Sequence, residues 1–124
     1  TFAIYKKDMN NKSTITLEVT LDEQKMPDTI TWSATQSEVN EPLDARAFML
    51  SIWDPAERNA LRIDLWTKKM MVDEMIDFYF QTFYGLAETF ERATKNKELA
   101  KELKTFASSF QKKAMDALDK EQNQ

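Results

Sequence analysis

The sequence contains neither cysteine nor histidine among its 124 residues. These two absences exclude thiol nucleophiles, Ser-His dyads, disulfides, and metal or haem sites built on thiolate or imidazole. The single glycine, Gly85, excludes the P-loop and the dinucleotide fingerprint, because each needs several glycines beside a phosphate. No remaining nucleophile has a recognisable base beside it. We therefore predict that the protein is not an enzyme and binds no cofactor.

Neither sign of charge strongly dominates the sequence, and its apolar runs are short. The chain has 17 basic and 21 acidic side chains, a net charge of −4 that repels nucleic acid. No apolar run approaches the about 18 residues that a membrane helix needs. The first residues lack the apolar stretch of about 7–15 residues that a secretory signal carries. We expect no nucleic-acid partner, no membrane insertion and a cytoplasmic location.

The length predicts one domain, whose core can hold without metals or disulfides. We expect an N-terminal extension over residues 1–12, a single α+β domain over 13–119 and a frayed tail over 120–124. Met9 is a plausible translation start, so residues 1–8 are expected to be dispensable for folding.

Strands dominate the first half of the sequence. Apolar residues alternate with polar ones in four segments, and this period of two predicts half-buried strands. A polar, acidic stretch over 36–44 contains Pro42 and predicts a loop, and Pro55 sets the last turn. The predicted strands are Thr14–Leu21, Thr29–Thr35, Arg46–Trp53 and Ala60–Trp66.

Helices dominate the second half, where apolar residues recur at steps of three and four. One helix is predicted from Val72 to about Thr94, and Asn96 is the expected N-cap of a second. Gly85 lies inside the first helix, where it suggests the close approach of a neighbouring backbone or ring. The predicted fold is a four-stranded antiparallel sheet followed by two helices packed on one face, a two-layer ββββαα domain.

The last two predicted strands have an apolar side and a mixed side. We expect the apolar side to join the core: Phe48, Leu50, Ile52, Leu61, Ile63 and Leu65. The mixed side should face away from the helices, beside the threonines and serine of the first two strands. Two exposed tryptophans and a methionine there exceed ordinary scattered exposure. We predict that this side binds a protein partner, with another subunit, the 36–44 loop or the N-terminal extension as alternative covers. The candidate partner-binding residues are Met49, Trp53, Arg62 and Trp66.

Two other features are weaker candidates for a site. Asp73 and Asp77 lie one helical turn apart, but acidic residues near a helix N-terminus are common and no calcium-loop motif supports them, so we predict no metal site. An aromatic cluster in the first helix favours core packing over a pocket for a hydrophobic ligand. Its members are Phe78, Tyr79, Phe80, Phe83 and Tyr84.

Several segments resemble one family. Residues 62–75 read RIDLWTKKMMVDEM, and residues 81–94 read QTFYGLAETFERAT; residues 19–35 read VTLDEQKMPDTITWSAT, and residues 49–54 read MLSIWD. In this order they resemble the GldC family of gliding-motility proteins of Bacteroidetes, over about residues 13–110. The sequence departs from the family pattern at Met71, where proline is expected, at Phe80, where histidine is common, and in the 36–41 loop, which lacks glycines.

The resemblance implies a small, non-enzymatic, cytoplasmic accessory of the gliding machinery without catalytic residues or a cofactor. Three molecular roles stay open. The first is an interaction protein that docks on a motility component through the outer sheet face. The second is an export chaperone, since the predicted layout is similar to that of SecB in architecture. The third is a carrier of a small hydrophobic ligand.

Overall fold

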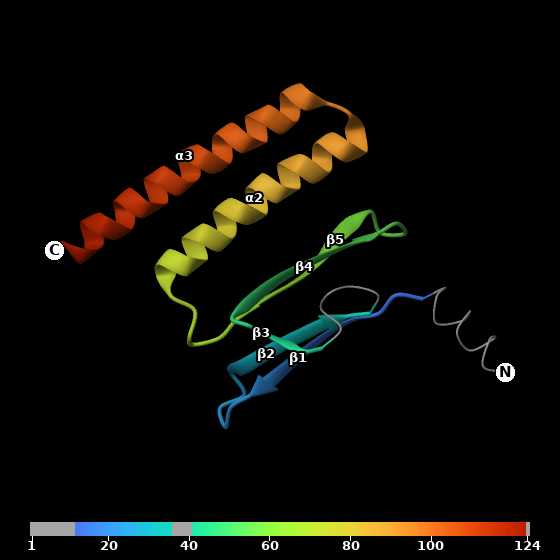
Figure 1. Ribbon diagram of the computed structural model, residues 1–124, viewed down its shortest axis with the longest axis vertical. Helices are drawn as coiled ribbons and strands as arrows, with labels where there is room; N and C mark the ends of the chain where they lie inside the picture. Colours follow the sequence, from blue (N-terminus) through green and yellow to red (C-terminus); the bar gives the residue numbers. More distant parts are fainter. Residues whose placement is uncertain (1–11, 36–40, 124) are drawn as a thin grey trace. The chain divides into compact units, whose positions relative to one another are not determined.

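The computed structural model describes residues 12–35 and 41–123 (Figure 1). Contacts group these residues into two compact units, a strand unit up to Met70 and a helical unit from Met71. The packing of helices on a sheet face stays a prediction. The predicted extension over 1–12 lies outside the described residues except for Lys12, as does the 36–40 part of the predicted loop.

The strand unit begins with the hairpin of β1 (Ile15–Leu21) and β2 (Pro27–Ala34). Its antiparallel register places Val19 opposite Ile30 and Leu17 opposite Trp32, so these apolar side chains share one face. Ile30 is 1% exposed and is the most deeply buried large side chain of the unit. The threonines alternate with them on the other face, as the period of two predicted.

The prediction of one four-stranded sheet is wrong, because the strands form two sheets. β3 (Leu43–Ala45) pairs with β2 and completes a three-stranded sheet in the order β1-β2-β3. Among the described residues, β4 (Ala47–Asp54) pairs with β5 (Asn59–Trp66) alone, in a second sheet. The predicted loop over 36–44 therefore ends earlier than expected, since its last two residues belong to β3.

Arg46 separates the two sheets, since it belongs to neither β3 nor β4. Before Arg46 the apolar residues Leu43 and Ala45 are odd-numbered, and after it the apolar residues Phe48 and Leu50 are even-numbered. A bend of this kind lets one length of chain pair with β2 and then with β5. The Thr67 N–H donates to the Arg46 carbonyl oxygen at 2.8 Å, which continues the β4–β5 ladder up to the bend.

The helical unit is an antiparallel pair, α2 (Val72–Thr94) and α3 (Lys97–Gln122) (Figure 1). At the start of α2, the Glu74 side chain accepts a hydrogen bond from the Met71 N–H at 3.1 Å. At its end, Lys95 adopts the left-handed conformation, with φ 61°, and donates its N–H to the Glu91 carbonyl oxygen. Asn96 is the N-cap of α3 as predicted, since its side chain accepts from the Leu99 N–H at 3.1 Å.

The two helices meet through small residues and aromatic rings. Ala87, Ala100 and Ala107 are fully buried, so the helix backbones approach closely at these positions. Beside them the Phe83 ring contacts the rings of Phe106 and Phe110, with centroids 5.6 and 5.4 Å away. These contacts support the prediction that the aromatic residues of α2 serve packing.

Two details of the helices bear on the predictions. A Cβ atom added at Gly85 would meet no atom of the helical unit within 4 Å, so α3 does not account for this glycine. The helix α3 ends at Gln122, and the fraying of residues 120–124 stays a prediction.

Candidate functional site

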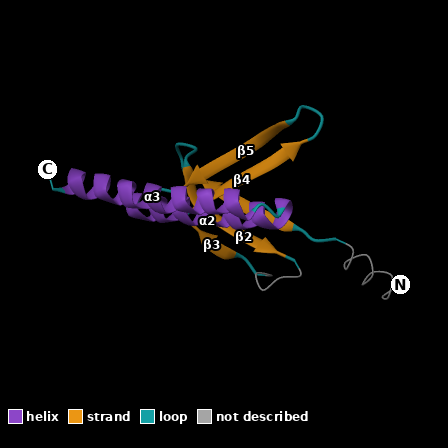
Figure 2. Cartoon of the chain, turned by 90° about the horizontal axis from the view of Figure 1, so that it is seen from above, coloured by secondary structure: helices purple, strands orange, loops and turns teal. Residues whose placement is uncertain are grey.

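The candidate site is one face of the β4–β5 hairpin, which Figure 2 shows as a two-stranded ribbon. A four-residue turn over 55–58 joins the strands. There Asp54 accepts hydrogen bonds from the N–H groups of Ala56 and Arg58. The turn sets the register, and the register sets which side chains share a face. The tryptophan face consists of Ala47, Met49, Ser51, Trp53, Ala60, Arg62, Asp64 and Trp66.

Each tryptophan of this face lies directly opposite an alanine. Trp53 on β4 faces Ala60, and Trp66 on β5 faces Ala47. A methyl group covers little of an indole ring, and Trp53 and Trp66 are 59% and 58% exposed. The two indoles stand at opposite ends of the hairpin, about 20 Å apart along the strands for six residue steps.

An ion pair occupies the space between the tryptophans. The Arg62 guanidinium binds the Asp64 carboxylate in a bidentate manner, through Nη2 to Oδ1 at 2.7 Å and Nε to Oδ2 at 3.1 Å. Both side chains are nearly half exposed, at 48% and 41%. Met49 lies directly opposite Asp64 and is half-buried. The structure thus places all four predicted partner-binding residues on one face, and their role in binding stays a prediction.

The opposite side of the hairpin carries the six residues that were predicted to join the core. The register confirms that they share a face, since Phe48 pairs with Leu65, Leu50 with Ile63 and Ile52 with Leu61. Ile52, Leu61 and Ile63 are each 53% exposed within the hairpin, and their packing in a core stays a prediction. We call this side the aliphatic face.

The threonines expected beside the tryptophans belong to a different sheet. Thr16, Thr20, Thr29 and Thr31 lie on β1 and β2, and neither strand pairs with β4 or β5. The sequence prediction of one outer surface shared by threonines and tryptophans therefore does not hold as a single sheet face. It had assumed that all four predicted strands pair side by side.

A polar contact missed at the sequence level ties the end of β5 to the turn after β1. Asp22 Oδ1 accepts hydrogen bonds from the N–H groups of Gln24 and Met26, both at 2.9 Å. Asp22 Oδ2 forms an ion pair with Lys68 Nζ at 2.9 Å. The Met26 N–H above all, and then Lys68, lower the pKa of Asp22 from 3.8. The hydrogen bond to Asp22 in turn raises the pKa of Lys68 from 10.5.

The sequence contains a signal for the turn at Asp22 but none for its ion pair with Lys68. Aspartate often binds N–H groups two residues ahead in a turn, and Asp22 opens a polar stretch directly after a strand. Lys68, in contrast, is distant in the sequence and follows a different strand. The contact joins two loops of the strand unit and serves its structure.

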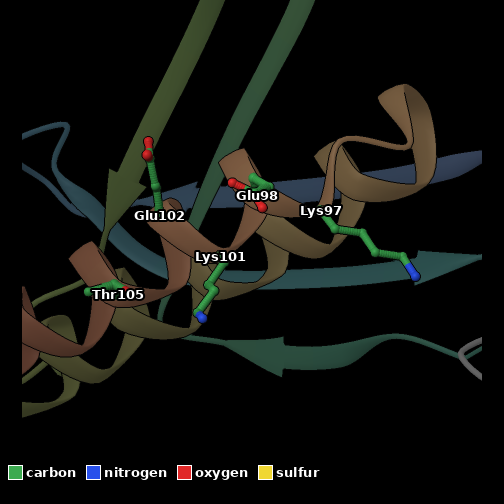
Figure 3. A pocket seen from close by; sticks show the side chains of 5 residues that line it. All are labelled: Lys97, Glu98, Lys101, Glu102 and Thr105. Carbon is green, nitrogen blue, oxygen red and sulfur yellow. The ribbon is translucent and has the colours of Figure 1, made fainter.

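The other places where a ligand could lie are less suited to binding. A hollow of about 440 Å³ lies along α3. Figure 3 shows the side chains that line it, with Lys101 and Glu102 leaving the helix on opposite sides. Its lining is polar and charged, which does not suit an apolar ligand. The lining residues are Lys97, Glu98, Lys101, Glu102 and Thr105.

The acidic pair of α2 does not assemble into a larger cluster. Within residues 12–35 and 41–123, no three acidic side chains gather where they could hold a metal ion. Asp73 instead accepts a hydrogen bond from the Glu74 N–H at 2.9 Å, inside the first turn of α2. None of the helices in the described part of the chain combines the length and apolar character needed to cross a bilayer.

Comparison with known proteins assigns the chain to a family. The family model described as gliding motility-associated protein GldC-like matches residues 27–116, which include β2 to β5, α2 and most of α3. Comparisons with curated proteins and with solved structures found no match. The matched region covers well over half of the chain and includes every residue of the tryptophan face. The chain therefore belongs to the GldC-like family of gliding motility-associated proteins.

Proposed function

We propose that this protein is a non-enzymatic, cytoplasmic accessory of the gliding machinery that acts by docking on another protein of that machinery. The family supplies the association with motility. The observation that carries the docking role is the tryptophan face, where two indoles more than half exposed flank a bidentate ion pair. Tryptophan and arginine are the residues most enriched among those that dominate binding energy at protein interfaces.

The tryptophan face has the make-up of a protein-binding surface. Its two ends offer large apolar rings, and its middle offers Arg62 and Asp64, which can exchange their mutual ion pair for hydrogen bonds to a partner. The face is part of a paired β-ribbon, so its side chains are held in a defined order without loop rearrangement. A partner that fits would present apolar pockets at both ends and polar groups between them.

The export chaperone rests on a predicted layout with one four-stranded sheet, and the strands form two sheets instead. The ligand carrier also receives less support than docking. A carrier needs an enclosed apolar cavity, and the hollow along α3 is lined by charged side chains. The aromatic rings of the helical unit contact one another instead of lining such a cavity. We therefore retain docking as the proposed function.

The double substitution Trp53→Ser with Trp66→Ser tests the proposal. Both side chains are mostly exposed, so folding should survive, while binding should weaken by ~2 kcal/mol or more. Affinity capture from gliding cells with the wild-type and variant proteins would identify the partners that depend on the tryptophans. Cells carrying the variant should also lose gliding, and fractionation of the wild-type cells would test the cytoplasmic location.

The matched control is Ile52→Ser with Leu61→Ser, which alters two residues of similar exposure on the aliphatic face of the same hairpin. The control should retain the partner that the tryptophan variant loses. If both variants retain every partner and cells carrying either one still glide, the docking proposal is wrong. A tryptophan variant that unfolds would show instead that the indoles are covered within the protein.

A further inference from the structure

The outer edge of β5 is open to another strand. β5 pairs with β4 along one edge, and no strand of the described residues pairs with the other. Its eight residues contain neither proline nor lysine, two of the devices that protect edge strands from association. A two-stranded hairpin alone is at best marginally stable in water, so a further strand would stabilise it.

The hydrogen-bonding pattern tells which residues of β5 point their backbone groups outward. The Thr67 N–H donates to the Arg46 carbonyl oxygen, so Thr67 faces the β4 side. Backbone direction alternates along an antiparallel strand. Ala60, Arg62, Asp64 and Trp66 therefore direct their N–H and carbonyl groups toward the open edge.

We propose that β5 pairs antiparallel with β5 of a second copy of this chain, with Ile63 on the two-fold axis. This register places Arg62 opposite Asp64 of the partner subunit, and Asp64 opposite the partner's Arg62. Two ion pairs then cross the interface. The outward-pointing backbone groups of both strands face each other, as a regular antiparallel ladder requires.

The other side chains fit the same register. Leu61 comes opposite Leu65 of the partner subunit on the aliphatic face. On the tryptophan face, Trp66 comes opposite the partner's Ala60, so a large ring faces a methyl group. Charge, size and polarity are therefore complementary along the length of the strand.

Neighbouring registers are disfavoured by charge. A shift that keeps the outward backbone groups paired moves Arg62 opposite Arg62 of the partner subunit, or Asp64 opposite the partner's Asp64. Like charges directly opposite each other destabilise a strand pair. A shift by one residue instead would turn the aliphatic face of one copy to the tryptophan side of the other. The Arg62-Ile63-Asp64 sequence thus specifies both the partner and the register.

The pairing extends both surfaces of the hairpin. It joins two hairpins into one four-stranded sheet in which the aliphatic faces of both copies lie on the same side. The tryptophan faces lie together on the other side, where they would offer a partner protein four indoles. Both proposals involve Arg62 and Asp64, but the self-pairing is measured by the oligomeric state and the docking by captured partners, so either can fail without the other.

Charge reversal tests the pairing by sedimentation equilibrium of the full chain. The wild-type protein should dimerise. Arg62→Asp alone and Asp64→Arg alone each place like charges across the axis and should weaken the dimer about tenfold or more. An equimolar mixture of these two variants should form heterodimers, because each supplies the charges that the other lacks. The double variant Arg62→Asp with Asp64→Arg should again form homodimers.

This design separates loss of pairing from loss of folding, because two variants that fail alone should succeed when mixed. A wild-type protein that stays monomeric up to its solubility limit would contradict the proposal. Single variants that dimerise as strongly as the wild type, or a mixture that forms no heterodimer, would do the same.

Cysteine substitution tests the register. The native chain has no cysteine, so Ile63→Cys introduces a single thiol on the proposed axis, where the two Cα atoms would lie about 4.5 Å apart. Mild oxidation should link this variant into a covalent dimer. The control is Leu61→Cys, which replaces a side chain of the same exposure, 53%. In the proposed register, position 61 lies opposite Leu65 of the partner subunit. The two thiols of this variant would therefore be separated by four residues along the strands. Equal cross-linking of the two variants, or none at position 63, would overturn the register.

Discussion

The β4–β5 hairpin and the α2–α3 hairpin differ in how far they bury their apolar side chains. The helical hairpin buries Ala87, Ala100 and Ala107 completely where its backbones meet, and it packs aromatic rings against one another. The strand hairpin leaves Ile52, Ile63 and other large side chains more than half exposed on both faces. The helical hairpin also exposes large side chains, such as Leu86 at 56% and Phe106 at 55%. The difference is that the helical hairpin contains fully buried residues, whereas no residue of β4 or β5 is fully buried.

Spectroscopy can follow the two regions separately. All three tryptophans, Trp32, Trp53 and Trp66, belong to strands, and none belongs to a helix. Tryptophan fluorescence therefore reports on the strand unit, while far-ultraviolet circular dichroism reports mainly on α2 and α3. Denaturant titrations followed by both signals can show whether a substitution affects one unit or the whole protein.

The largest expected effect is that of Phe83→Ala, which removes a ring in contact with Phe106 and Phe110. The free energy of unfolding should fall by ~3 kcal/mol, at the lower end for such changes because Phe83 is only half-buried. Denaturant titration followed by circular dichroism measures it. Lys112→Ala is the control, since Lys112 is 80% exposed and its ion pair with Asp116 should contribute at most ~0.5 kcal/mol. Equal losses in the two variants would refute a helical hairpin held by its aromatic contacts.

A smaller effect of opposite sign is expected for Gly85→Ala. Gly85 lies inside α2, and the added methyl group meets no atom within 4 Å, so only the helix propensity changes. The free energy of unfolding should rise by ~1 kcal/mol, because alanine is the better helix former. Thermal unfolding followed by circular dichroism would detect it. A loss of stability would show that another part of the molecule packs at this position.

The smallest effect concerns acid and the strand unit. The pKa of Asp22 is lower in the folded protein than its ordinary value of 3.8, so the ionised carboxylate stabilises the fold above that pH. This stabilisation should be lost as the pH falls below 3.8 through the folded pKa. Asp22→Asn should therefore be less stable than the wild type near neutral pH, and the difference should narrow in acid. Fluorescence-detected melting at several pH values measures it, and a constant difference would contradict the assignment.

Lys68 provides the matched alkaline test. Its pKa is raised above 10.5 by the hydrogen bond to Asp22, so its contribution is present below that pH and disappears as the pH rises through the folded pKa. Lys68→Met should remove this alkaline dependence while leaving the two N–H bonds to Asp22 in place.

Local periodicity predicted most of the elements, because a period of two or of 3.6 is visible in adjacent residues. Among the described residues, it located four of the five strands and both helices, with Asn96 as a cap. β3 was missed because its three residues follow Pro42 and contain Asp44, which together indicate a loop. The division into two sheets was missed because alternation within a strand carries no information on which strand it pairs with.

The candidate site shows the same limit. Alternation placed Trp53 and Trp66 on one face, since β4 and β5 are adjacent strands joined by a short turn. It could not show that Ala60 and Ala47 stand opposite them, because that depends on the register. Nor could it show how exposed Ile52 and Leu61 are. A period of two shows which side chains share a face, but it does not show what packs against that face.

The chain order of the pairings also bears on how fast the protein folds. β1 with β2, β4 with β5 and α2 with α3 are each neighbours along the chain, and β3 adds a short pairing with β2. Hairpins of neighbouring segments close small loops and form on a timescale of about microseconds. Chains rich in such local contacts fold in about milliseconds or less. The strands should therefore form soon after they leave the ribosome, with the β5 edge open until a second copy arrives.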